Sequence, residues 1–275
     1  MRRQELPFIH NEPDKKLLEV GLLNVVHLIE IAQTEEQLAE AKVLDDLAFG
    51  PHLGVTMEEL TEIMNHGAVL LLRDAQGQLI GESQVITSPT SQHQSLASDE
   101  AYNYGTAVHP ALQNHGIAQI LFRGQELVAL EAGKTKNTLT ARLENAPSLR
   151  GRFKSGYQVT GYDPNYYGSL EEGGARLIME KNHLNQHKVF TPESLVNMAT
   201  NGDVLIVDQE NIEKAIQNGQ SFIGIVINSG DQTDLTAHKL VAKIFDTDKF
   251  IGIGLLKPNE LDISQTASFL ILQHQ

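Results

Sequence analysis

A strand pattern, a proline and a helix pattern follow one another between residues 101 and 132, and this succession constrains the fold more than any other feature. Residues 101–108 are rich in aromatic and β-branched side chains, and Pro110 must end the strand because proline cannot donate a ladder hydrogen bond. Residues 116–132 carry apolar side chains at nearly helical spacing, and Gly133 follows as a stop. A strand that leads directly into a helix is typical of α/β folds.

The same alternation extends to both sides of this segment. Capping boxes at Thr34 and Thr56 predict a helix near residues 35–48 and a second, shorter helix that ends at His66. Further strands are predicted at residues 25–32, 68–73, 78–88, 138–143, 158–162 and 175–180, with a short helix that reaches Lys154. Residues 88–99 are polar and predict an exposed loop.

A polar stretch at residues 183–189 separates this pattern from a second one. The second pattern predicts helices at residues 192–200, 209–218 and 233–245 and strands at 203–208, 220–228, 250–256 and 268–273. We therefore expect an N-terminal extension at residues 1–24, a domain at 25–187 and a smaller α/β accessory domain at 188–275. The two domains are expected to have independent cores joined by a polar linker.

The composition excludes several kinds of chemistry. The 275 residues include no cysteine, which removes disulfides, thiolate zinc sites, iron–sulfur clusters and cysteine nucleophiles. The net charge of -14 disfavours nucleic acid as a partner, because such proteins neutralise phosphates with basic side chains. The N-terminus resembles no signal peptide, and no apolar run approaches the ~18 residues of a membrane span, so we expect a cytoplasmic protein. His183 and His187 have helical ligand spacing but no acidic partner, so no metal is expected.

Residues 108–118, V-H-P-A-L-Q-N-H-G-I-A, form the most informative motif. The first turn of a helix leaves backbone N–H groups without partners and carries partial positive charge, so an anion is its natural ligand. Gly116 and Ala118 keep side chains away, so that a diphosphate can reach the backbone. Neither a Rossmann fingerprint nor a P-loop motif is present. His109 and His115 flank the turn and could contact a phosphate or face solvent.

The stretch Q-N-H-G-I-A after V-H-P resembles the Q/R-x-x-G-x-G/A motif of the GNAT superfamily of N-acyltransferases, and E-N-A and F-K-S-G-Y downstream resemble its later region. The resemblance covers about residues 25–181. It implies a GNAT-like mixed α/β sheet with an acyl-CoA, expected to be acetyl-CoA, between two splayed parallel strands at 101–108 and 138–143. The cofactor-binding residues it implies are Ala107 and Val108 for the pantetheine, Gln113, Asn114, His115, Gly116, Ile117 and Ala118 for the pyrophosphate, and Asn145 and Arg152.

A cluster of basic residues lies just after the motif. Residues 134–154 hold six lysines and arginines against the single acidic residue Glu144, in a chain with a net charge of -14. A local positive field of this kind would attract the negatively charged CoA.

The resemblance also implies that the acceptor amine attacks the thioester directly, so the protein must supply a base and an oxyanion donor. Glu144 is the first candidate for the base, although it could instead be a helix N-cap. Tyr104 could order a water or donate a proton, or be a half-buried strand aromatic. A backbone N–H near Gly105, where a bulge is expected, is the candidate oxyanion donor. The family's usual acid tyrosine is replaced by Arg152 and Phe153, and the hydroxyls available downstream are those of Tyr162, Tyr166 and Tyr167.

The C-terminal residues 201–275 resemble the N-terminal half of D-aminoacyl-tRNA deacylase, without its S-Q-x-T motif. We expect a structural or recognition module without hydrolase activity. The leading hypothesis is an N-acetyltransferase that acts on a primary amine of a small molecule or protein. The alternatives are a non-catalytic acyl-CoA-binding sensor or scaffold and an enzyme that acylates aminoacyl-tRNA. The acceptor, the acyl length and the oligomeric state stay open.

Overall fold

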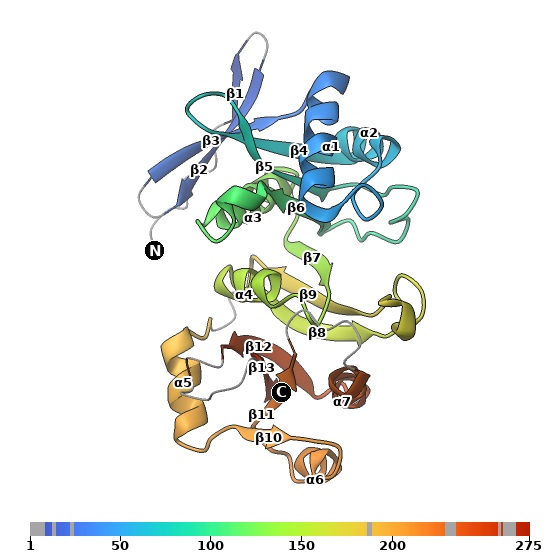
Figure 1. The fold of residues 1–275 in the computed structure, drawn as a ribbon, viewed down its shortest axis with the longest axis vertical. Helices are drawn as coiled ribbons and strands as arrows, with labels where there is room; N and C mark the ends of the chain where they lie inside the picture. The colour runs from blue at the N-terminus through green and yellow to red at the C-terminus, as the bar shows by residue number, and fades with distance from the viewer. Residues whose placement is uncertain are drawn as a thin grey trace. The chain divides into compact units, whose positions relative to one another are not determined.

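The computed structural model describes residues 9–12, 15–22, 25–185, 189–228, 235–257, 260 and 268–275, with side chains described from residue 28 onward. The chain divides into two compact units, Met1–Thr138 and Leu139–Gln275. In Figure 1 the first unit runs from blue to green and the second from yellow-green to red. Strand β7 (Lys136–Ala141) contributes its first half to one unit and its second half to the other.

The first unit is built on a mixed sheet. Its strands follow the order β1 (Ile9–Glu12), β2 (Lys15–Leu22), β3 (Val25–Ile31), β4 (Gly67–Arg73), β5 (Leu79–Ile86), β6 (Glu100–Val108) and β7. The pairs from β1 to β6 are antiparallel, whereas β6 and β7 are parallel. The parallel register covers only Glu100–Tyr102 of β6 and Lys136–Thr138 of β7. The predicted mixed sheet is confirmed, and β1 and β2 are strands that were not predicted from the sequence.

Helices cover both faces of this sheet. Helices α1 (Glu35–Phe49) and α2 (Met57–His66) begin at the two predicted capping boxes. They pack with Val69, Leu71, Ile86 and Tyr102 on one face. Helix α3 (Ile117–Glu131) packs with the alternate strand residues Leu70, Leu72 and Val85 on the other face. The two-residue period of a strand therefore gives the unit a separate apolar cluster on each side.

The strands of the second unit also form a mixed arrangement, which begins at the shared strand β7. Its strand order is β7, β9 (Arg176–Asn182), β8 (Gln158–Asp163), β12 (Phe250–Leu256), β13 (Ser268–His274), β11 (Phe222–Ile227) and β10 (Leu205–Val207). The strands β10 and β11 are parallel, and the pairs among β8, β9, β11, β12 and β13 are antiparallel. Its helices are α4 (Ala146–Lys154), α5 (Pro192–Thr200), α6 (Ile212–Gln217) and α7 (Leu235–Phe245).

One apolar cluster joins the segments before and after residue 187. Leu149, Tyr157 and Leu177 pack in the same cluster as Ile225 and Leu240. The expected independent cores are therefore not found, because strands β8 and β9 share their core with the C-terminal elements. The domain division at residues 187 and 188 stays a prediction.

The segment at residues 88–99 departs from the expected exposed loop. Thr90 is buried, and the His93 ring lies against the Tyr102 ring with their centroids 4.1 Å apart. Part of this loop thus covers β6. Among the helices in the described ranges, none combines the length and the apolar composition needed to cross a bilayer.

Candidate functional site

The turn between β6 and α3 forms an exposed cradle, which we define as residues 113–118. Asn114 and Gly116 both have left-handed backbone conformations, with φ of 66° and 83°. Gly116 is the N-cap of α3 and makes no side-chain capping bond. A Cβ placed on Gly116 would meet no atom within 4 Å. Glycine is therefore favoured here by its φ angle, and the space beside the N-cap of this 15-residue helix is open.

The two histidines beside the cradle have local structural roles. The Ala111 N–H donates to Nδ1 of His109 at 3.3 Å, which caps the 3-10 turn Pro110–Leu112. Nδ1 of His115 lies 2.9 Å from the Gln113 carbonyl oxygen. These contacts fix the shape of the turn, and His115 stays exposed.

Strand β6 carries the predicted bulge at Gly105. Ser83 pairs with Thr106 and Val85 pairs with Asn103, so Gln84 opposes both Tyr104 and Gly105. A Cβ on Gly105 would lie 2.2 Å from Oε1 of Gln84. Glycine is needed at this position because the Gln84 amide approaches so closely.

Tyr104 is more constrained than the sequence suggested. Its hydroxyl donates to Oε1 of Glu59 at 2.8 Å and lies 3.0 Å from Oε1 of Gln92. Helix α2 and the 88–99 loop therefore hold the ring in place. The hydroxyl proton of Tyr104 points at Glu59. Tyr104 could therefore interact with a substrate only by accepting a hydrogen bond at its hydroxyl oxygen.

Two buried carboxyl groups near the bulge, those of Glu82 and Asp45, were not predicted from the sequence. Glu82 is fully buried on β5, and its Oε2 accepts from the Gln84 side chain. Burial raises the pKa of Glu82 well above its ordinary value, and the nearby Asp45 adds to the effect. Asp45 accepts the Val55 N–H at 2.7 Å, and burial raises its pKa to about 6. In the sequence Glu82 is an acidic residue within a predicted strand and Asp45 an acidic residue within a predicted helix, and neither pattern indicates that the side chain is buried.

Glu144 belongs to a buried polar group in the second unit. Its carboxylate lies 3.9 Å from Arg142 and 3.8 Å from Nε2 of His238, and Nδ1 of His238 is 2.8 Å from the Tyr162 hydroxyl. The N-cap interpretation of Glu144 is wrong, because Asn145 is the N-cap of α4 and accepts the Ser148 N–H. Burial, followed by the charge of Glu144, raises the pKa of Tyr162.

The other predicted residues of the second unit serve local packing. Arg152 is buried, and its guanidinium lies 5.3 Å from the centre of the Tyr157 ring. The rings of Tyr166 and Tyr167 contact each other edge to face, and Arg176 lies over Tyr167. His187, part of the histidine pair set aside as a metal site, lies outside the described residues.

Some side chains of the basic cluster at residues 134–154 bind neighbouring residues of the protein. Lys134 donates to the Ser98 carbonyl at 2.7 Å, and Lys136 lies 3.5 Å from Glu100. Of the predicted site residues, Tyr104, Ala107, Val108 and the cradle belong to the first unit, whereas Glu144, Asn145 and Arg152 belong to the second. The first unit therefore brings together the cradle, the bulge and Tyr104 on one strand–turn–helix segment.

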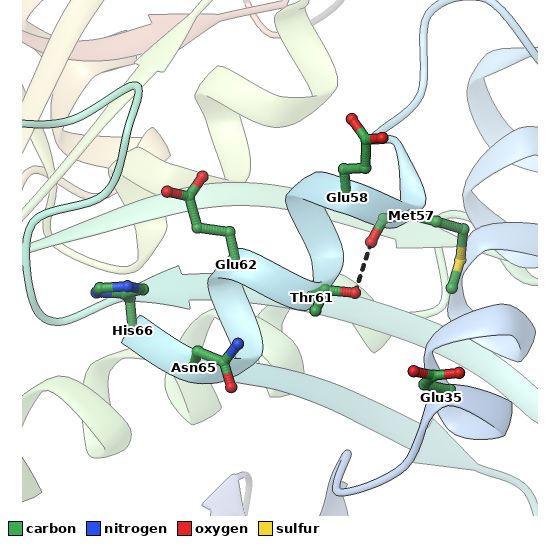
Figure 2. Close-up of a pocket in the computed structure, with 7 residues that line it drawn as sticks. All are labelled: Glu35, Met57, Glu58, Thr61, Glu62, Asn65 and His66. Carbon is green, nitrogen blue, oxygen red and sulfur yellow. Dashed lines mark hydrogen bonds between the residues drawn. The ribbon is translucent and has the colours of Figure 1, made fainter.

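The first unit also has an acidic pocket of about 570 Å³ along α2. Figure 2 shows its lining: Glu35, Met57, Glu58, Thr61, Glu62, Asn65 and His66. Glu62 accepts hydrogen bonds from the backbone and hydroxyl of Ser91, which lowers its pKa. The pocket consequently has a negative rim.

Comparison with known proteins gives matches at the level of solved structures. Neither a family model nor a curated protein matches the chain. Nourseothricin acetyltransferase is 21% identical, with 42% of this chain and 65% of that chain covered and a TM-score of 0.36. Ribosomal-protein-S18-alanine N-acetyltransferase from Escherichia coli is 17% identical, with 59% of this chain and 97% of that chain covered and a TM-score of 0.47. A GNAT-like decarboxylase in complex with isobutyryl-CoA is 15% identical, with 56% of this chain and 98% of that chain covered and a TM-score of 0.44. The chain thus spans about two thirds of the nourseothricin enzyme. These comparisons do not show the predicted likeness to D-aminoacyl-tRNA deacylase, and at such identities the activity has to be argued from the residues.

Proposed function

We propose that this protein is an acyl-CoA-dependent N-acyltransferase, and specifically an acetyltransferase acting on a primary amine. The observation that carries the proposal is the cradle, where Asn114 and Gly116 have left-handed backbones and Gly116, the N-cap of α3, has no side-chain cap and open space beside it. Backbone N–H groups and the helix dipole bind a diphosphate without a basic side chain. The residues present therefore fit the pyrophosphate of CoA.

The remaining roles follow from the strand that leads into the cradle. Acetyl-CoA would supply the acyl group as a thioester, from which the acceptor amine displaces the CoA thiol. The pantetheine would lie along Ala107 and Val108, and an N–H at the Gly105 bulge would stabilise the oxyanion. Glu144 is the residue we propose as the base, and the Tyr104 oxygen would accept a hydrogen bond from a water or from the acceptor amine. Asn145 is proposed as a further cofactor contact, whereas the burial of Arg152 against Tyr157 does not favour the cofactor role expected for it. The acidic α2 pocket favours a cationic acceptor.

A specific observation supports a second candidate, a non-catalytic acyl-CoA-binding module. Arg152 is buried against Tyr157, and it lies where the family that this sequence resembles has the tyrosine that acts as the acid. Incubation of the full-length protein with acetyl-CoA and a panel of amines separates the two candidates. Acyl transfer supports the enzyme, and binding without transfer to any amine supports the module.

The cradle itself is tested by Gly116→Glu, with Gly116→Gln as a matched control of equal size. Both variants strain the left-handed backbone, which costs about 1–2 kcal/mol of stability. We expect Gly116→Glu to weaken acetyl-CoA at least ~100-fold and Gly116→Gln only ~10-fold, because the carboxylate adds repulsion of the diphosphate. Calorimetric titration measures both. Equal, wild-type affinity in two folded variants would place the site elsewhere, and no binding to the wild type would remove the proposed function.

A further inference from the structure

The buried side chain of Gln125, in the middle of α3, reaches the β6 bulge. Gln125 has no exposed surface. Its Nε2 donates to the Gln84 carbonyl at 2.9 Å and to the Gly105 carbonyl at 3.0 Å, and lies 3.5 Å from Oγ1 of Thr106. A primary amide has two N–H hydrogens, and the two carbonyl groups use both. The helix thus replaces, at the bulge, a hydrogen bond that the strand ladder cannot make.

The amide is held in one orientation. Three acceptors face Nε2, whereas Oε1 of Gln125 is buried without a hydrogen-bond partner. Leaving a buried amide oxygen unpaired costs free energy, and turning the amide over would place that oxygen against two carbonyl oxygens instead. A side chain retained at this cost needs an explanation other than packing.

The Gly105 carbonyl determines where the next N–H points. In a trans peptide the C=O and the following N–H point in opposite directions, so fixing the Gly105 carbonyl toward Gln125 directs the Thr106 N–H the other way. The hydrogen bonds between β5 and β6 give the same direction. The His109 N–H donates to the Ile80 carbonyl oxygen. Because hydrogen-bonded and non-hydrogen-bonded pairs alternate along an antiparallel ladder, Thr106 and Ser83 form a non-hydrogen-bonded pair. The Thr106 N–H therefore points away from β5, toward the edge of β6 on which the parallel register ends at Tyr102.

We propose that Gln125 is a positioning residue that directs the Thr106 N–H at the carbonyl oxygen of the bound thioester. This inference rests on the proposed function and identifies the oxyanion donor of that site. Gln125 itself does not touch the substrate. It acts through the Gly105 carbonyl, and the N–H so oriented needs no reorganisation as negative charge develops on the oxygen.

The test uses full-length protein and acetyl-CoA with a ¹³C-labelled thioester carbonyl. A hydrogen bond from the Thr106 N–H lowers the carbonyl stretching frequency of the bound thioester, and difference infrared spectroscopy measures it without turnover. We expect Gln125→Met to reduce the lowering without removing it, because the register with Ser83 and the bond from Oγ1 of Thr106 to the Gly105 carbonyl persist. The variant should keep acetyl-CoA affinity within about threefold and, with any amine accepted by the wild type, lose about tenfold in kcat. Gln84→Met is the matched control, because the Gln84 side chain is equally buried but does not bind the Gly105 carbonyl. The control should keep the lowered frequency.

A second variant keeps the test decisive if Gln125→Met does not fold. The carboxyl group of Gln125→Glu can donate to Gly105 only when it is protonated. The carbonyl stretching frequency of the thioester bound to this variant should therefore match that of the wild type at about pH 6 and rise to that of Gln125→Met at about pH 9, whereas the frequency in the wild type should be the same at both pH values. A frequency that is lowered equally in the wild type and both Gln125 variants would overturn the inference while leaving the proposed function. A wild type that does not bind acetyl-CoA would overturn both.

Discussion

At the scale of single residues, the molecule concentrates unusual chemistry around one bulge. Glu82 and Gln84 lie on β5 beside it, Gln125 reaches it from α3, and Oε1 of each of these three side chains is buried without a hydrogen-bond partner. Gly105 could be predicted from the sequence, because glycine inside a strand marks a bulge or a close approach. Gln125 could not be predicted, because helical periodicity identifies apolar positions and treats a glutamine as a surface residue.

Asp45 provides a prediction about pH. Its pKa is about 6 in the folded protein, against an ordinary value of 3.8 for an exposed aspartate, so between these values the native state holds a proton that the unfolded chain has lost. The free energy of unfolding therefore falls as the pH rises through this window. Asp45→Asn removes the loss and keeps an oxygen to accept the Val55 N–H. We expect the variant to gain about 1–2 kcal/mol relative to wild type between about pH 4 and pH 7, a value reduced by solvent screening.

Urea unfolding at both pH values measures this difference. Asp45→Ala is the control, since it removes the charge and the acceptor together and should lose stability at every pH. A difference between wild type and Asp45→Asn that does not change with pH would show that Asp45 is ionised throughout.

At the scale of elements, local signals predicted the helices better than the strands. Thr34 and Thr56 begin α1 and α2 as their capping boxes indicate, because the bonds that define a cap lie within four residues. Strand β2 was missed because Lys15–Leu22 does not alternate polar and apolar residues, so its pattern gave no strand signal. The hydrogen bond between Tyr162 and His238 spans 76 positions, a separation that no short window contains, so it could not be predicted either.

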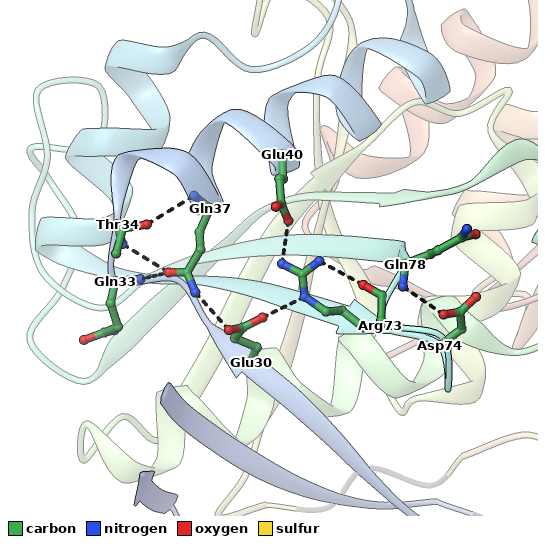
Figure 3. Close-up of polar contacts among 9 residues, drawn as sticks. Glu30, Gln33, Thr34, Gln37, Glu40, Arg73, Asp74 and Gln78 are labelled. Carbon is green, nitrogen blue, oxygen red and sulfur yellow. Dashed lines mark hydrogen bonds and ion pairs between the residues drawn. The ribbon is translucent and has the colours of Figure 1, made fainter. Parts of the chain in front are cut away.

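An ion-pair network ties α1 to the sheet and gives a second prediction. Figure 3 shows Arg73 between Glu30 and Glu40, with Gln37 also bonded to Glu30. The Glu30 side chain is only 7% exposed and accepts from Nε of Arg73 at 2.8 Å. Arg73→Met keeps the apolar stem but leaves a buried carboxylate with one donor, so we expect a loss of about 2–4 kcal/mol in the free energy of unfolding.

Urea unfolding of a double-mutant cycle checks the cause. In the Arg73→Met background, Glu30→Gln should recover part of the loss, because the uncompensated charge is gone. Strict additivity of the two substitutions would mean that Arg73 stabilises the protein by packing alone.

At the scale of the whole chain, the sequence indicated the order of elements but not how their cores are shared. The polar stretch near residue 187 resembles a linker, yet apolar residues on both sides of it belong to one cluster. Polar composition reports that a segment lies at the surface, and it carries no information about which elements pack beneath. The first unit, in contrast, has clusters of its own on the two faces of its sheet.

Truncation tests this sharing. A fragment of residues 1–187 lacks Ile225, Leu240, Leu270 and the other C-terminal members of the cluster that buries Leu177 and Tyr157. Exposing one fully buried apolar side chain costs about 1.5–3 kcal/mol. The loss of several such side chains therefore exceeds the free energy of unfolding of a typical domain, roughly 5–15 kcal/mol. We expect amide hydrogen exchange in β8 and β9 to lose its protection in the fragment, while β4 and β5, buried in the first unit, keep theirs as an internal control. Full protection of β8 and β9 in the fragment would show instead that residues 139–187 fold without the C-terminal elements and that the boundary at 187 divides two autonomous domains.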